Sequence, residues 1–191
     1  TIQRLSKEWH SGAALGMPNY QPAKDHPAFL VDWLAAKMFC HWLALKEDLV
    51  YRLPTDREWS AAVGISELED YRVEPESRSK RVRDVYSWGK QWPMPAGMEN
   101  VSLSMTGGDA TVMPASVMSH QPNAFGLYDL GGNVMEWCED PLNDTSFYFI
   151  LRGADWATPM TKEAHLASFR RWLPAKQNLK EEPVGTGFRV V

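Results

Sequence analysis

The clearest pattern of apolar and polar positions predicts a helix that begins after Asp32. The short carboxylate of Asp32 can accept a hydrogen bond from a free amide of the first turn, as an N-cap does. Apolar residues then recur at the spacing of one helical face, at Trp33, Ala36, Phe39, Cys40 and Leu43. We therefore expect this face, including Cys40, to pack on the core, with His41 outside it.

A second helix is predicted from Thr55. Thr55 and Glu58 have the spacing of a capping box, in which the hydroxyl and the carboxylate each bond to the other residue's backbone amide. The helix continues through Trp59 and Val63, and Gly64 is the residue type that commonly follows a helix end.

The strand signals are short. Aromatic and β-branched residues predict a strand at 147–151, a terminal strand at 185–191 and an extended segment at 51–54. Residues 164–172 fit either a strand or a short helix. Residues 1–28 carry turn signals and no clean period. Residues 65–84 are dominated by charge, which predicts a solvated, mobile insertion.

Composition adds a few exclusions. A chain of 191 residues is long enough for one domain, 1–191, with its own core. A net charge of −4 and the lack of a basic stripe argue against nucleic-acid binding. No apolar run is long enough for a membrane span. Cys40 and Cys138 are expected to be buried free thiols, which favours a reducing compartment such as the cytoplasm.

Residues 125–137 concentrate candidate chemistry. Asp129, Asn133 and Glu136 surround Gly131 and Gly132, two residues whose value must lie in their backbone. Oxygen-bearing side chains around such a bend are what Ca²⁺ requires. A tight turn with Asp and Asn in their usual turn roles is the commoner explanation, and the residues alone leave both open.

Several motifs then carry a family resemblance. They occur in order at 26–27, 31–33, 40–42, 52–59, 86–89, 125–128, 132–137, 151–153 and 187–189. Together they resemble the formylglycine-generating enzyme (sulfatase-modifying factor) family. The resemblance implies an α+β, C-type-lectin-like fold with two helices, small antiparallel sheets and extensive ordered loops.

The resemblance also argues against the family's oxidase chemistry. The oxidases bind copper through two cysteines, a soft ligand pair that suits Cu(I). Those positions hold Thr158 and Glu163 here, Asp155 replaces a nearby serine, and Met135 replaces the usual tryptophan of its motif. The five histidines show no ligand spacing. We therefore expect neither copper nor iron.

Calcium is the cofactor that the resemblance does imply, as a structural ion. One site maps onto Asp129, Gly132, Val134 and Glu136, with Gly132 and Val134 acting through their carbonyls. A second maps onto Asn100, Val101, Asp109 and Thr111, with Val101 and Thr111 acting through their carbonyls.

The leading functional hypothesis is a non-catalytic module that binds a protein or small-molecule ligand, as in the family's retroelement variable proteins and kinase-associated domains. Its surface would use Asp155, Trp156, Thr158, Arg170, Arg171 and Trp172, since exposed Trp and Arg are typical of binding hot spots. For Trp156 a packed core position is the better interpretation; Arg171 and Trp172 are the favoured contacts. The alternative is a metal-dependent oxidase or hydroxylase with a relocated site.

The family usually begins with strands well upstream of the first helix, and about thirty residues precede that helix here. Missing strands would leave the edge beside the terminal strand open, and an open apolar edge invites association. We therefore expect either a second chain or homodimer at this edge, or residues 1–28 packed in place of those strands.

Overall fold

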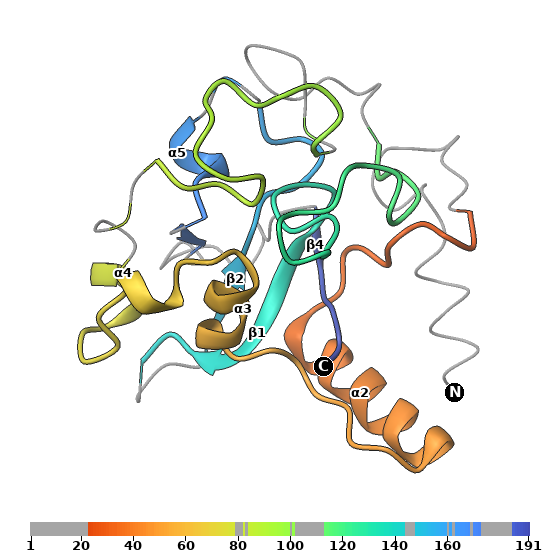
Figure 1. Ribbon diagram of the computed structural model, residues 1–191. Coiled ribbons are helices and arrows are strands. Elements are labelled where there is room, and N and C mark those ends of the chain that lie inside the picture. The colour runs from red at the N-terminus through yellow and green to blue at the C-terminus, as the bar shows by residue number, and fades with distance from the viewer. Residues whose placement is uncertain are drawn as a thin grey trace.

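The computed structural model describes residues 23–78, 82, 84–99, 101, 113–143, 148–159, 161, 163–168, 170–172 and 185–191. The helices are α2 (Trp33–Glu47), α3 (Asp56–Ala62), α4 (Pro75–Arg78) and α5 (Glu163–Leu166), with a 3-10 turn η2 (Ser66–Leu68). The strands are β1 (Met135–Pro141), β2 (Phe149–Arg152), β3 (Arg171–Trp172) and β4 (Thr186–Gly187). Figure 1 shows β1 and β2 in the middle, with α2 on one side and α3 and α4 on the other.

Both predicted helix starts are confirmed. The Asp32 side chain accepts a hydrogen bond from the Ala35 amide at 2.7 Å. At α3, Thr55 and Glu58 form both bonds of the capping box. After α3 the chain turns at Gly64, whose φ of 78° is a conformation that glycine adopts without strain. On the predicted core face of α2, Ala36 and Cys40 are buried as expected, whereas Phe39 is 41% exposed.

The sheet differs in detail from the expected one. Its strand order is β3-β2-β1-β4; β1–β2 and β2–β3 are antiparallel, whereas β1–β4 is parallel. The sheet is therefore mixed. The expected terminal strand is confined to β4, and residues 164–172 supply both a short helix, α5, and a strand, β3.

The alternation of side chains along β1 places its residues in two of the three apolar clusters formed by the described residues. Met135 and Trp137 of β1 pack on the α2 side with Ala36 and Cys40. Cys138 lies on the α3 side with Trp59. Since successive strand residues face opposite sides, one strand can anchor both helices. Both cysteines are free and buried, which confirms the prediction for the thiols.

The charged segment 65–84 is less solvated than its composition suggested. Glu69 extends from the end of η2 into the protein, where its side chain is fully buried against Arg171. Arg78, on α4, is also buried and pairs with Asp56. Other members, such as Arg72, remain exposed. Two charges of this segment thus belong to the core.

Part of the chain covers the edge beside β4. The Val31 amide donates to the Thr186 carbonyl at 3.1 Å, and Arg52 and Val191 exchange two backbone hydrogen bonds of 3.1 and 2.9 Å. The edge that the sequence predicted to be open is therefore occupied at these positions by the chain itself. No helix in the described ranges is long and apolar enough to cross a membrane.

Candidate functional site

The Gly131–Gly132 bend lies immediately before β1 and is held by side-chain hydrogen bonds. Asp129 and Asn133 both adopt left-handed backbone conformations, with φ of 58° and 67°. The side-chain amide of Asn133 exchanges two hydrogen bonds with the backbone of Ala115: its Oδ1 accepts from the Ala115 N–H, and its Nδ2 donates to the Ala115 carbonyl. Asp129 Oδ2 accepts from the Met118 amide at 2.8 Å. The bend therefore fastens a distant loop to the start of the sheet.

Two carboxylate oxygens near this bend lie buried without a hydrogen-bond partner among the described residues. One is Asp129 Oδ1 and the other is Glu99 Oε2. The other oxygen of Glu99 accepts from Ser87 Oγ at 2.5 Å and from the Gly131 amide at 3.0 Å. A side chain on Gly131 would collide with Ser87 and Glu99, which explains the glycine there.

Glu99 is the residue near the bend that the sequence analysis missed. Its side chain is buried, and this burial raises its pKa to about 7, with a further contribution from the negative charges of Asp129 and Glu136. Buried carboxylates are rare unless they are paired with a cation or a metal. Glu99 directly precedes Asn100 and Val101, two predicted ligands, and that proximity was the only available signal.

Glu136 of β1 is already engaged. It forms an ion pair with Arg189, whose Nε donates to Oε2 at 2.7 Å and whose second nitrogen reaches Oε1. Trp59 Nε1 donates to the same Oε2 at 2.8 Å. A cation bound at Glu136 would have to share these oxygens with a guanidinium.

The predicted calcium ligands therefore fit the ion in part. Asp129 offers a buried oxygen that has no hydrogen-bond partner in the described part of the chain, and the bend also buries Gly132 and Val134. Within the described ranges no three His, Cys, Asp or Glu side chains form a metal-binding group, so backbone carbonyls would have to complete the shell. At the second predicted site Val101 is buried, whereas Asn100, Asp109 and Thr111 lie outside the described residues.

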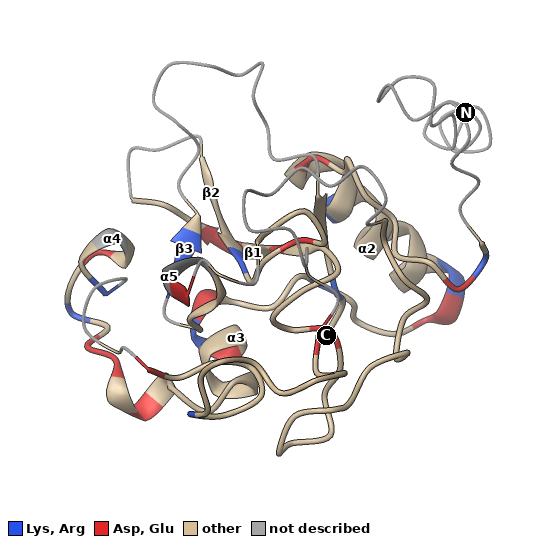
Figure 2. Cartoon of the chain, turned by 90° about the horizontal axis from the view of Figure 1, so that it is seen from above, with Lys and Arg blue, Asp and Glu red and all other residues tan. Residues whose placement is uncertain are grey.

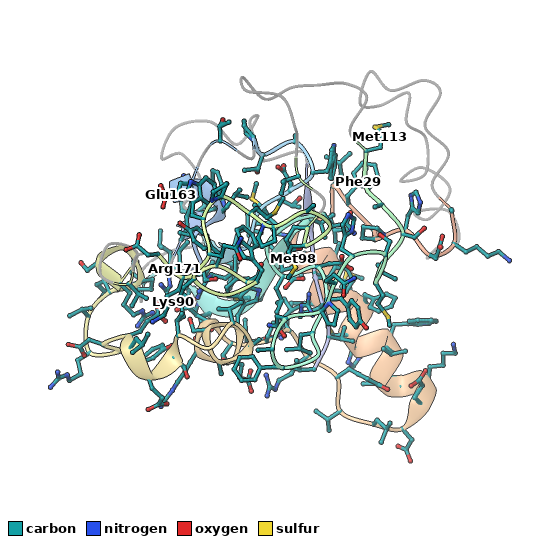
Figure 3. The ribbon with its side chains drawn as sticks, turned by 45° about the horizontal axis from the view of Figure 1, so that its top comes forward. Phe29, Lys90, Met98, Met113, Glu163 and Arg171 are labelled. Carbon is teal, nitrogen blue, oxygen red and sulfur yellow. The ribbon has the colours of Figure 1, made fainter. Side chains whose placement is uncertain are left out.

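Thr158 and Glu163, at the positions where the resemblance places the oxidases' cysteines, are both hydrogen-bonded to neighbouring side chains. Thr158 is buried and its hydroxyl donates to Asp155 Oδ1 at 2.7 Å. Burial raises the pKa of Asp155. Glu163, on α5, accepts a 2.6 Å hydrogen bond from the Tyr86 hydroxyl. Figure 3 shows Glu163 and Arg171 toward the same side of the molecule.

The predicted binding residues separate into two groups. Asp155, Trp156, Thr158 and Arg171 are buried, so they have little surface to offer a ligand. The core position expected for Trp156 is confirmed by its 2% exposure and its edge-on contact with Phe29. Arg170 and Trp172 are only half-buried, and the Arg170 guanidinium lies 3.9 Å from the centre of the Trp172 ring.

Arg171 belongs to a buried ion cluster that the sequence did not indicate. Its Nε donates to Asp56 at 2.9 Å, and its Nη1 donates to Glu69 at 2.7 Å. Arg152 also pairs with Asp56, and Arg152 and Arg171 have fully buried side chains. Figure 2 shows the basic residues of β2 and β3 near the acidic residues of α3. Arg171 thus has a buried position instead of the exposed one expected for it.

The sequence comparison decides the family. A profile of the sulfatase-modifying factor enzyme 1-like domain, FGE-sulfatase, matches residues 5–191. The chain belongs to this family. The mixed sheet and helices of this FGE-sulfatase domain agree with the α+β, C-type-lectin-like fold implied by the sequence.

Two of its curated relatives are much longer proteins. It is 31% identical over 132 residues to the serine/threonine-protein kinase pkn1 of Chlamydia pneumoniae, covering 68% of this chain and 16% of the kinase. It is 29% identical over 123 residues to the formylglycine-generating enzyme of Thermomonospora curvata, covering 61% of this chain and 34% of the enzyme. The chain thus spans only a minor part of each relative.

Solved structures agree on the fold. PvdO from Pseudomonas aeruginosa has a TM-score of 0.59 at 25% identity, covering 91% of this chain and 64% of that one. Treponema denticola variable protein 1 has a TM-score of 0.57 at 19% identity, covering 90% of this chain and 74% of that one. The second likeness concerns the fold alone.

Proposed function

We propose that this FGE-sulfatase domain is a non-catalytic binding module, stabilised by calcium. The proposal rests mainly on the side chains found at two positions. Thr158 and Glu163 stand where the resemblance places the oxidases' copper-binding cysteines, and each is hydrogen-bonded to a neighbouring side chain. A hydroxyl and a carboxylate are poor ligands for Cu(I). The chain's two thiols, Cys40 and Cys138, pack in different clusters, and burial raises the pKa of both.

Arg170 and Trp172 are the best-placed ligand contacts among the predicted residues. Trp172 is fixed by a 2.8 Å hydrogen bond from its Nε1 to the Gly153 carbonyl, and its ring supports the Arg170 guanidinium. Arg170 Nε is buried without a hydrogen-bond partner among the described residues, and burial lowers its pKa. A guanidinium held 3.9 Å from the centre of an indole ring suits a carboxylate or phosphate beside an apolar group.

The proposal is tested by two measurements on one preparation. A cysteine-containing sulfatase peptide supplied with Cu(I) should show no turnover. On an array of anionic peptides and small acids, Arg170→Ala should weaken binding by at least about tenfold, the effect of losing a charge-assisted hydrogen bond. Arg57 also lies over an aromatic ring, that of Tyr71, so Arg57→Ala is the matched control and should bind as wild type. Turnover, or equal losses in both variants, would overturn the proposal.

The calcium part of the proposal rests on Asp129 Oδ1, which is buried and accepts no hydrogen bond from the residues that the structure describes. We place the ion at the Gly131–Gly132 bend, bound by Asp129 and by main-chain carbonyls of Gly132 and Val134. Glu99 Oε2 is a second buried acceptor beside this bend. Glu136 is paired with Arg189, so it could bind the ion only through a carboxylate lone pair that the guanidinium does not use. The ion's role here is to neutralise buried carboxylates and hold the bend.

Chelation should therefore lower the melting temperature. A ligand that binds only the folded state stabilises it by about 2.7 kcal/mol at a hundredfold excess over Kd, or roughly 5–11 °C for a domain of this size. Asp129→Ala should remove the sensitivity to chelator in differential scanning calorimetry. Asp70→Ala should retain it, because Asp70 pairs with Arg72 at the surface. Identical wild-type melting curves with calcium and with chelator would exclude the ion.

A further inference from the structure

The outer face of α2 carries apolar residues where a surface helix normally carries polar ones. Leu34, Met38, Trp42, Leu45 and Leu49 have exposed fractions of 63%, 57%, 37%, 73% and 59%. We refer to these five residues as the α2 stripe. Four of them lie on α2, and Leu49 follows the left-handed cap residue Asp48. Figure 1 places α2 at the periphery of the molecule, with its C-terminal turns farthest from the sheet.

The α2 stripe lies opposite the face that anchors the helix. Ala36 and Cys40 are buried against the sheet, and at 3.6 residues per turn they are on the other side of the helix from Met38 and Leu45. The helix is therefore apolar on two faces, and among the described residues only the inner face is packed against the rest of the protein. A helix with apolar residues on opposite faces is normally buried on both.

The spacing of the stripe is symmetric about a point between residues 41 and 42, half a residue from Trp42. Leu34 and Leu49 lie eight and seven residues from Trp42, and Met38 and Leu45 lie four and three residues from it. If two copies of α2 cross antiparallel at this point, Leu34 of one copy meets Leu49 of the other, and Met38 meets Leu45. A two-fold interface requires this self-complementarity, in which each residue's partner is also matched in reverse.

We propose that the α2 stripe pairs antiparallel with the stripe of a second copy of this chain, with the two-fold axis beside Trp42. The five residues of the stripe are uncharged, and the Lys46 ammonium, 5.0 Å from the centre of the Trp42 ring, borders the proposed interface. The helical part of the stripe, from Leu34 to Leu45, spans roughly 16 Å at 1.5 Å per residue. The homodimer expected from the sequence therefore uses the outer face of α2 and not the edge beside β4, where Val31 and Arg52 are already bonded.

Sedimentation velocity over a wide range of protein concentration tests the association. The mass should double as concentration rises. Leu34→Glu should shift the dissociation constant by at least about tenfold, since it places a charge in an apolar contact. Leu68→Glu is the matched control, because Leu68 has a similar exposure of 60% but lies on η2. A monomer at every concentration would overturn the proposal.

A cross-linking experiment tests the register. A cysteine beside the two-fold axis faces its own copy, so Trp42→Cys should form an intermolecular disulfide on mild oxidation, whereas Leu68→Cys should not. The natural cysteines are buried and do not interfere. Equal cross-linking of both variants would overturn the antiparallel register. If Leu34→Glu lowers the melting temperature without changing the mass, the stripe is covered within its own chain and the proposal falls.

Discussion

Replacing Asp56 by Asn is expected to lower the free energy of unfolding by about 3–5 kcal/mol, the usual effect of removing one partner from a buried ion pair. Asp56 is 2% exposed and faces three guanidinium groups, those of Arg78, Arg152 and Arg171. An amide in its place would leave those groups with Glu69 as the remaining carboxylate of the cluster. Uncompensated charges in a buried site are strongly unfavourable.

The measurement is denaturant unfolding of the wild type and of two variants. Asp70→Asn is the control, because it removes the same charge from a surface pair in which Arg72 is 90% exposed, and such pairs contribute about 0–1 kcal/mol. If Asp56→Asn loses no more than Asp70→Asn, the buried cluster is not a source of stability.

The same carboxylate predicts the direction of the pH dependence. Burial alone would raise the pKa of Asp56, but Arg152 and Arg171 outweigh it and hold the pKa below its ordinary value of 3.8. The folded state therefore binds the proton less readily than the unfolded state. Its contribution to stability is present above about pH 4 and is lost as the pH falls further. The difference between wild type and Asp56→Asn should shrink over that acidic range.

The two helices were predictable because their signals are local. Asp32, Thr55 and Glu58 act on amides within one turn, so the sequence specifies the bonds without knowledge of the fold. Strand β1 was not predicted. Its first residues follow the glycine bend, and Glu136 interrupts the apolar run of Met135, Trp137 and Cys138. Only the fold shows that Glu136 is buried and paired with Arg189.

The sequence predicted which segments form the candidate site, but it did not predict which side chains contact one another there. The sequence predicted the position of the glycine bend. The resemblance also pointed to Thr158 and Glu163 as the residues in place of the oxidases' cysteines. The sequence did not show that Arg171 meets Asp56, 115 positions away, or that Glu69 of a charged segment turns inward. Ion pairs over such sequence distances depend on tertiary packing, and charge alone normally indicates a solvated surface. The exposed role expected for Arg171 followed from that general rule.

Replacing Trp59 by Ala is the second substitution expected to have a large effect. Trp59 is 2% exposed and contacts two ion pairs, Arg152–Asp56 and Arg189–Glu136. Its ring lies 4.3 Å from the Arg152 guanidinium, and its Nε1 donates to Glu136 at 2.8 Å. Truncation of a buried Trp leaves a cavity and costs about 3–5 kcal/mol, which corresponds to roughly 6–20 °C in melting temperature for a domain of this size.

Trp59→Phe separates packing from hydrogen bonding at this position. Phenylalanine keeps an aromatic face for Arg152 but cannot donate to Glu136, so its cost should be smaller, about 1–3 kcal/mol. Combining it with Glu136→Gln should give a non-additive loss, because residues that share a hydrogen bond couple by about 0.5–3 kcal/mol. Calorimetry of the single and double variants measures this coupling. Additive losses would mean that Trp59 acts only by filling space. The Arg152–Asp56 and Arg189–Glu136 ion pairs would then be independent of each other.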